Sequence, residues 1–132
     1  KVLGKDHPYT FLSMNNLALA YDKAGQLEKA ETVLRKILEL RRQRFPGEWK
    51  TFNSAAVLGN ILAKRKQSQE AEPLLLEGVE GMRSRRDKIP PASRSLIQSR
   101  IRWLVELYTA TKKDDEATKW RDELSKETTS NN

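Results

Sequence analysis

The stretch that decides the fold is residues 16–34, NLALAYDKAGQLEKAETVL, because it returns twice further along the chain. The second copy is VLGNILAKRKQSQEAEPLL at 57–75, and the third is WLVELYTATKKDDEATKWR at 103–121. Each copy holds two apolar stripes with the period of an α-helix, separated by a short polar turn. Self-similar units of this length are the signature of stacked helix hairpins, which bury their apolar faces only against neighbouring units.

Small residues recur where the two helices of each hairpin would meet. They are Ala18 and Gly59 in the first helices, and Ala30, Ala71 and Ala117 in the second helices. A small side chain at these positions lets the two backbones approach closely.

Larger apolar residues are predicted to fill the core around these small ones, with Leu17 and Tyr21 as the examples from the first helix. Gly78 and Gly81 are poor helix formers. We expect them to allow close packing of their helix against the next hairpin.

The helix boundaries follow from prolines, glycines and capping residues. Pro8 belongs in the first turn of a helix that Asp6 or His7 can cap and that ends near Gly25. Pro73 is expected in the first turn of a later helix. The further helices are predicted at 27–44, 48–65, 69–86, 91–111 and 114–126.

We therefore predict an all-α fold, a right-handed superhelical stack of three antiparallel helix hairpins with six helices and no strands. The single array divides into repeat one at 7–47, repeat two at 48–88 and repeat three at 89–127. Residues 1–6 are interpreted as the tail of a preceding repeat, and 128–132 as a polar tail.

The pattern resembles the tetratricopeptide repeat (TPR). Residues 1–21, KVLGKDHPYTFLSMNNLALAY, are similar to the longer, kinesin-light-chain type of this repeat. Residues 70–81, EAEPLLLEGVEG, resemble repeats found behind bacterial serine/threonine kinases and in related signalling proteins. The second copy departs from the type, since PGEWKT at 46–51 replaces GKDHPYT, and the third copy is weaker still.

Composition excludes several functional classes. The 132 residues contain no Cys and one His, so disulfides, thiol catalysis and His-rich metal sites are ruled out. No apolar run approaches the length of a membrane span. The net charge of +7 permits anionic partners.

No catalytic set is found, and we expect no enzymatic activity and no cofactor. His7 has no nucleophile or acid at a motif spacing, and the acidic run at 114–116 splays around a helix and favours capping. Residues 83–102 hold seven Arg and Lys against one acid, Asp87. A nucleic-acid surface there is the least favoured alternative, because no aromatic residues interleave the charges.

The resemblance implies a concave groove lined by the first helix of each hairpin. In the family, an Asn at the position of Asn16 holds the backbone of a bound peptide. Arg102 and Trp103 are of types enriched at binding hot spots, although Trp103 can instead pack one first helix against another. The groove candidates are Asn15, Asn16, Leu19, Lys23, Phe52, Asn60, Lys64, Arg102, Trp103 and Glu106. The same register adds Leu12, Ala55, Ala56 and Ser99.

The leading interpretation is a module that binds a protein, as a peptide or partner helix, in this groove. Lys23, Lys64 and Arg102 favour an acidic or phosphorylated segment with a leucine or aromatic anchor. Family members that bind the C-terminal tails of chaperones hold the terminal carboxylate with a clamp of Lys and Asn side chains. In the first repeat Asn15 and Leu19 occupy the clamp positions, which disfavours this type of ligand. The alternative is a passive spacer or multimerisation scaffold. The resemblance implies a cytoplasmic, bacterial signalling protein with further domains, such as a kinase, upstream.

Overall fold

The computed structural model of the protein describes residues 8–130. Asp6, His7 and the tail assigned to residues 1–6 lie outside the described residues. The described part forms six α-helices: α1 (Pro8–Lys23), α2 (Leu27–Arg44), α3 (Trp49–Lys64), α4 (Ser68–Arg83), α5 (Ser95–Ala110) and α6 (Asp114–Ser130). Two short 3-10 turns, η1 (Arg86–Lys88) and η2 (Pro91–Ser93), connect α4 to α5.

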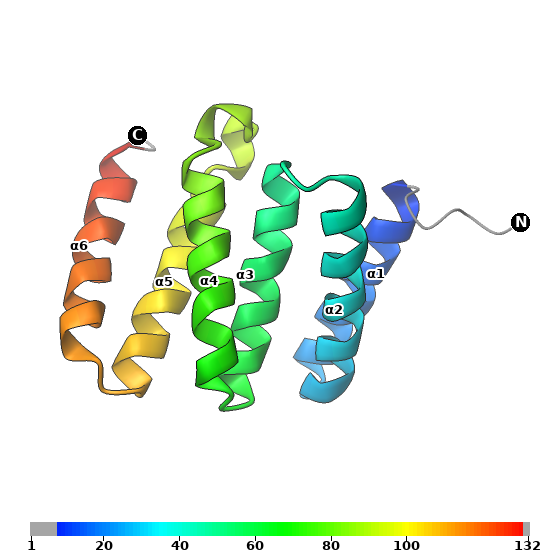
Figure 1. Cartoon of the computed structure of the whole chain (residues 1–132), viewed down its shortest axis with the longest axis horizontal. Coiled ribbons are helices and arrows are strands. Elements are labelled where there is room, and N and C mark those ends of the chain that lie inside the picture. The colour runs from blue at the N-terminus through cyan, green and yellow to red at the C-terminus, as the bar shows by residue number, and fades with distance from the viewer. Residues whose placement is uncertain (1–7, 131–132) are drawn as a thin grey trace, which may run out of the picture.

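The helices are arranged as three hairpins, which confirms the predicted all-α fold. α1 pairs with α2, α3 with α4, and α5 with α6, and the hairpins follow one another along the long axis (Figure 1). No strand occurs between residues 8 and 130. None of the described helices is long and apolar enough to cross a membrane.

The turn inside each hairpin has the same geometry in all three copies. Gly25, Lys66 and Lys112 occupy equivalent positions and all adopt the left-handed region, with φ of 77°, 66° and 60°. The amide of the following residue donates a hydrogen bond back to a carbonyl of the preceding helix. In the first copy Gln26 N donates to Tyr21 O at 2.8 Å, and the equivalent bonds of the second and third copies are both 2.9 Å long. This is the Schellman ending of a helix, and it satisfies carbonyls that the helix terminus would leave unpaired. Only the first copy uses glycine, the residue that adopts this conformation without strain.

The small residues have the role predicted for them inside the hairpins. Ala30 and Ala71 are fully buried, and Ala117 is 1% exposed. A Cβ added to Gly59 would lie 2.9 Å from Leu75 Cγ and 3.1 Å from Ala71 O, so this glycine sets the approach of α3 to α4.

Three sequence predictions about packing are wrong. Gly78 and Gly81 pack against α3 of their own hairpin, where an added Cβ would meet Ala56 and Phe52, and not against the next hairpin. Leu17 is 45% exposed, so it does not fill the core of its hairpin as predicted. Pro73 lies past the first turn of α4, on an exposed position.

The predicted helix ends are also corrected in three places. α6 continues to Ser130, past the predicted end at residue 126, so residues 128–130 belong to the helix and not to a polar tail. α5 begins at Ser95, four residues after Pro91, because the prolines at 90–91 initiate the separate turn η2. α4 ends at Arg83, and the residues after it form η1.

Polar contacts join neighbouring hairpins. Arg35 Nη2 of α2 lies 2.8 Å from Glu70 Oε2 of α4. The buried Tyr108 hydroxyl of α5 donates to Glu72 Oε2 of α4 at 2.7 Å. These contacts fix the second hairpin between the other two.

Candidate functional site

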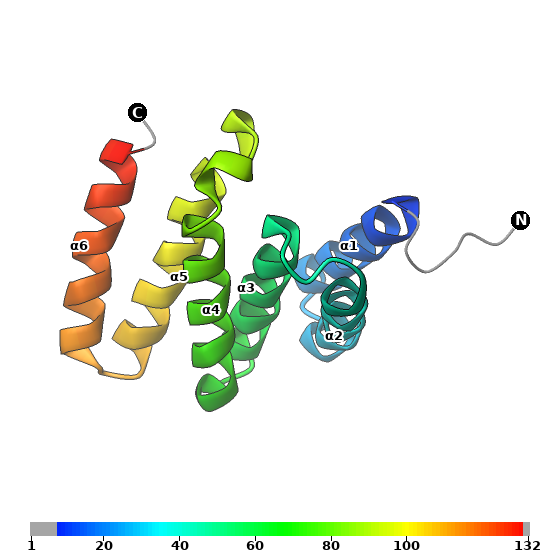
Figure 2. The ribbon, with the colours of Figure 1, turned by 45° about the horizontal axis from the view of Figure 1, so that its top comes forward.

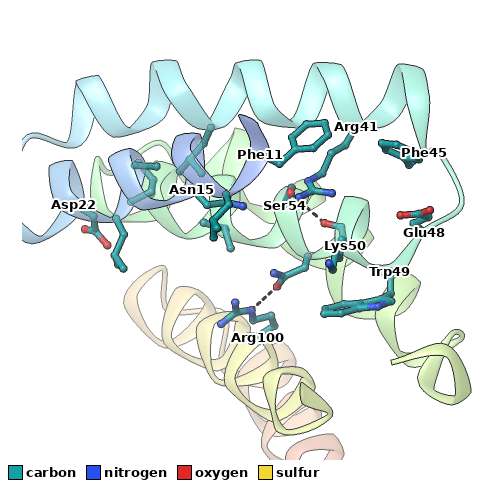
Figure 3. A pocket seen from close by; sticks show the side chains of 17 residues that line it. Phe11, Asn15, Asp22, Arg41, Phe45, Glu48, Trp49, Lys50, Ser54 and Arg100 are labelled. Carbon is teal, nitrogen blue, oxygen red and sulfur yellow. Dashed lines mark hydrogen bonds between the residues drawn. The ribbon is translucent and has the colours of Figure 1, made fainter. Parts of the chain in front are cut away.

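A cavity of about 560 Å³ lies between the first two hairpins and is called here the inter-hairpin cavity. Its walls come from α1, α2, the connection that follows α2, α3, and one residue of α5 (Figure 3). The lining residues are Phe11, Leu12, Asn15, Ala18, Leu19, Asp22, Leu34, Arg41, Phe45, Glu48, Trp49, Lys50, Asn53, Ser54, Val57, Ile61 and Arg100.

One wall is an accessible stripe of α1. Leu12, Asn15 and Leu19 follow one another at the spacing of one helix face, and Leu12 and Leu19 are 54% and 51% exposed. α1 packs along α2, and the second view shows the α1–α2 pair inclined away from α3 (Figure 2). At one end of this wall, Lys64 Nζ of α3 reaches Asp22 Oδ1 of α1 at 2.9 Å.

The opposite end of the cavity is aromatic and rigid. The rings of Phe11 and Phe45 meet edge to face with centroids 6.2 Å apart. Thr51 Oγ1 donates to the carbonyl of Phe45 at 2.6 Å, which holds the connection between α2 and α3. Trp49, at the first position of α3, completes this end.

Arg41 of α2 is buried in the floor of the cavity. Its side chain is 8% exposed, and its guanidinium carbon lies 4.2 Å from the centroid of the Phe11 ring. The buried Nε has no hydrogen-bond partner among the described residues. Burial lowers the pKa of Arg41 from its ordinary value, and Glu48 opposes this through its charge. Figure 3 shows the guanidinium directed toward Ser54.

Arg100 enters the cavity from α5. Its Nε donates to Asn53 Oδ1 of α3 at 2.9 Å, and its guanidinium stacks over the ring of Trp103 at 4.2 Å. Burial lowers the pKa of Arg100 to about 10, so the side chain stays charged at neutral pH. Arg100 therefore links the third hairpin to α3 of the second at the edge of the cavity.

The comparison with known families supports this architecture. Residues 1–43 match the family model of the tetratricopeptide repeat. The match spans α1 and nearly all of α2, and it supports a TPR family for the chain. The helix pairs of the later hairpins have the arrangement of a TPR-type array. No curated protein matches the sequence.

Within this TPR-type array, the predicted groove residues fall into three groups. Asn15 and Leu19 line the inter-hairpin cavity, as does Leu12 of the wider set. Lys64 stands at its edge with its charge paired to Asp22. The residues outside the lining are Asn16, Lys23, Phe52, Asn60, Arg102, Trp103 and Glu106.

Several of these placements are corrections with a clear physical reason. Arg100, and not Arg102, reaches the cavity, because residues two apart on a helix point about 200° away from each other. Glu106 is exposed and shares with Arg102 the part of α5 outside the cavity. Trp103 is half-buried beneath the Arg100 guanidinium, so it supports the arginine that lines the cavity.

Three of the α3 candidates, Phe52, Ala55 and Ala56, lie outside the lining of the inter-hairpin cavity. Phe52 lies beneath the guanidinium of Arg85 at 4.2 Å and against Gly81 of α4. Ala55 and Ala56 are fully buried. The α3 residues that line the cavity are Trp49, Lys50, Asn53, Ser54, Val57 and Ile61.

The basic region at 83–102 is largely engaged within the protein. Arg83 Nη2 lies 2.8 Å from Glu123 Oε1, and Arg86 pairs with the buried Glu127. Arg85 donates to the carbonyl of Gly47 at 2.7 Å. These side chains join α4 and its following turn to neighbouring elements, and so present less free charge than the sequence indicates. No group of acidic or His side chains suited to hold a metal ion is found among the described residues.

Proposed function

We propose that the chain is a protein-interaction module whose ligand, an extended peptide or a partner helix, lies in the inter-hairpin cavity. The observation that carries the proposal is the pair Leu12 and Leu19, which leave half of their apolar surface open on the wall of a cavity of about 560 Å³. Exposed apolar side chains around a concave site are typical of binding surfaces. The TPR match supports a protein as the partner.

The polar residues of the cavity suit a peptide backbone. Asn15 presents an amide that can donate and accept hydrogen bonds at once. A bound segment needs such partners, since each unpaired buried amide costs about 1–3 kcal/mol. The leucines of α1 would bind an apolar side chain of the same segment.

The module is proposed to act by binding and not by catalysis. Among the described lining residues Ser54 is the one with a hydroxyl, and that hydroxyl donates to the carbonyl of Lys50 at 3.0 Å. No nucleophile with an adjacent general base lines the cavity, as covalent catalysis would require.

A peptide-display experiment tests the proposal. A library of random ten-residue peptides is selected on the folded chain, and affinities are measured by fluorescence anisotropy. Leu19→Asp should weaken the selected peptides at least about tenfold, since one leucine contributes roughly 1.5–3 kcal/mol on full burial. Leu17→Asp is the matched control, because Leu17 is 45% exposed and lies outside the cavity lining.

Circular dichroism must show that both variants keep the helical content of the parent chain. Equal losses in the two variants would place the peptide elsewhere. Selection of no peptide at all would favour the alternative of a passive spacer or scaffold. Salt-dependent binding of random DNA, abolished by changes at Lys88 and Arg94, would favour the nucleic-acid alternative.

The wider setting is part of the proposal. The likeness of residues 1–21 to kinesin-light-chain repeats, and of residues 70–81 to repeats behind bacterial kinases, supports a module within a longer cytoplasmic signalling or scaffold protein. The complete reading frame around this sequence tests it. A frame that encodes a secretion signal would contradict the setting without affecting the groove.

A further inference from the structure

Arg41 is buried and Arg100 is half-buried, and neither pairs with an acidic residue in the described part of the chain. Three half-buried arginines, Arg65, Arg83 and Arg86, each pair with a glutamate. A fourth, Arg85, donates to the carbonyl of Gly47. Arg41 and Arg100 have no carboxylate within ion-pair distance among the described residues, although Arg41 is 8% exposed. Both line the inter-hairpin cavity.

Burying a guanidinium without a counter-ion is costly, because the lost hydration is not replaced by an opposite charge. The protein compensates in part through aromatic rings: Phe11 lies under Arg41 and Trp103 under Arg100, each at 4.2 Å. Glu48 influences Arg41 through its charge but forms no ion pair with it. Nε of Arg41 stays unpartnered in this arrangement.

We propose that Arg41 and Arg100 form a recognition site for an aspartate or glutamate side chain of the bound peptide. This inference rests on the proposed function and names the chemistry of its ligand. The two guanidinium groups reach the cavity from α2 of the first hairpin and α5 of the third, so an acidic side chain between α1 and α3 meets positive charge from both. The site lies beside Leu12 and Leu19, so the peptide carries an apolar residue close to the acidic one.

The charges around the cavity favour a carboxylate over a phosphate. The described lining residues include two acids, Asp22 and Glu48, and Asp22 is already paired with Lys64. Glu48 is therefore the remaining carboxylate beside the three lining cations, Arg41, Lys50 and Arg100. A carboxylate matches the flat, two-pronged guanidinium and adds one negative charge. A phosphate adds close to two and brings a third oxygen to be satisfied beside Glu48.

The peptides selected on the parent chain provide the test. We expect them to contain Asp or Glu, and replacing that residue by Asn or Gln should weaken binding at least about tenfold, as for a hydrogen-bonded charge. A phosphoserine at the same place should bind more weakly than the carboxylate. Peptides that bind without any acidic residue would overturn the inference while leaving the proposed groove intact, and selection of no peptide would overturn both.

Variants then assign the effect to the two arginines. Arg41→Met should weaken binding of the parent peptide by about the same factor as replacing the peptide's acidic residue by Asn or Gln. If the two groups are in direct contact, combining both changes should cause no further loss of affinity in a double-mutant cycle. Arg100→Met should behave in the same way. The matched controls are Arg42→Met and Arg102→Met, whose side chains are exposed and lie outside the cavity lining.

Thermal unfolding separates recognition from a structural role. Arg41→Met removes a buried, unpaired charge and keeps an unbranched side chain over Phe11, so its Tm should equal or exceed that of the parent. A lowered Tm together with unchanged peptide affinity would show that Arg41 serves the fold, and would overturn the proposal.

Discussion

The close approach of α3 and α4 predicts that Gly78→Ala destabilises the protein although alanine is the better helix former. A Cβ at position 78 would lie 2.6 Å from Ala56 Cβ and 2.7 Å from the carbonyl oxygen of Phe52. Neither atom can turn away, because one is a methyl fixed to the backbone and the other is the backbone itself. The two helices must therefore separate by several tenths of an ångström or more.

The magnitude follows from two opposing terms. Replacing glycine by alanine inside a helix gains about 1 kcal/mol. Overpacking a tight interior costs about 1–3 kcal/mol, and here the neighbours cannot relax, so the upper end applies. We expect a net loss of about 2 kcal/mol, which lowers Tm by on the order of 5–10 °C in a chain of this size.

Urea unfolding followed by circular dichroism measures this loss, with Gly47→Ala as the control. An added Cβ at Gly47 has no neighbour within 4 Å, so that variant should keep or slightly raise the stability through the unfolded chain. If Gly78→Ala proves as stable as Gly47→Ala, the packing of α3 against α4 described above is wrong.

Three further predictions concern the turns and polar contacts. Lys66→Gly should stabilise the protein by about 1 kcal/mol in urea unfolding, because the left-handed turn strains any residue with a Cβ. Gly25→Ala should destabilise it by about the same amount for the same reason. Effects of the opposite sign in these two variants would contradict the turn assignment. The hydrogen bond from Tyr108 holds the pKa of Glu72 in the folded protein below its usual value of 4.5. The ionised carboxylate therefore stabilises the fold above pH 4.5, and this stabilisation is lost as the pH falls through the lowered pKa of the folded state. Tyr108→Phe should reduce this acid-dependent loss in unfolding experiments at different pH, and an unchanged pH profile would refute the coupling. Arg35→Ala should change the free energy of unfolding by less than about 1 kcal/mol despite its two glutamate partners, because the pairs are exposed; a loss of several kcal/mol would contradict this.

The hairpins and their internal packing could be predicted from the sequence because both depend on local pattern. The register that aligns Ala30, Ala71 and Ala117 is set within each copy, and all three residues are buried as expected. The turns at Gly25 and Lys66 follow from the same register. Helix period and turn position need no knowledge of how one hairpin sits on the next.

The site could be predicted only in part, because it depends on how the hairpins sit on one another. Asn15 and Leu19 are predicted because they lie beside the packing stripe of α1, and both line the inter-hairpin cavity. The chain has Arg41, Arg42 and Arg44 close together, and nothing in the sequence marks Arg41 as the one that is buried against Phe11. A buried arginine in a second helix is visible only when the next hairpin closes over it.

The third hairpin shows the same limit. Its longer connection folds into η1 and η2, but the buried residues of α5 keep the register of α3: Ile97, Ile101 and Leu104 correspond to Thr51, Ala55 and Leu58. Arg100 therefore corresponds to Ser54, which lines the same cavity, whereas Arg102 corresponds to Asn15, on the side of α1 that faces the next hairpin. Which neighbouring hairpin a residue faces depends on how the hairpins stack, and the periodicity of the helix alone does not determine it.

The central claim, that a protein ligand lies between α1 and α3, is tested most directly by NMR of methyl groups in the full chain. A peptide selected from the random library is titrated to saturation while the leucine and valine methyl signals are followed. The account predicts large shifts at Leu12, Leu19 and Val57, which line the inter-hairpin cavity, and small ones at Leu17 and Leu124, which do not. Shifts centred on Leu17 or Leu124, with the three cavity residues unchanged at saturation, would contradict it.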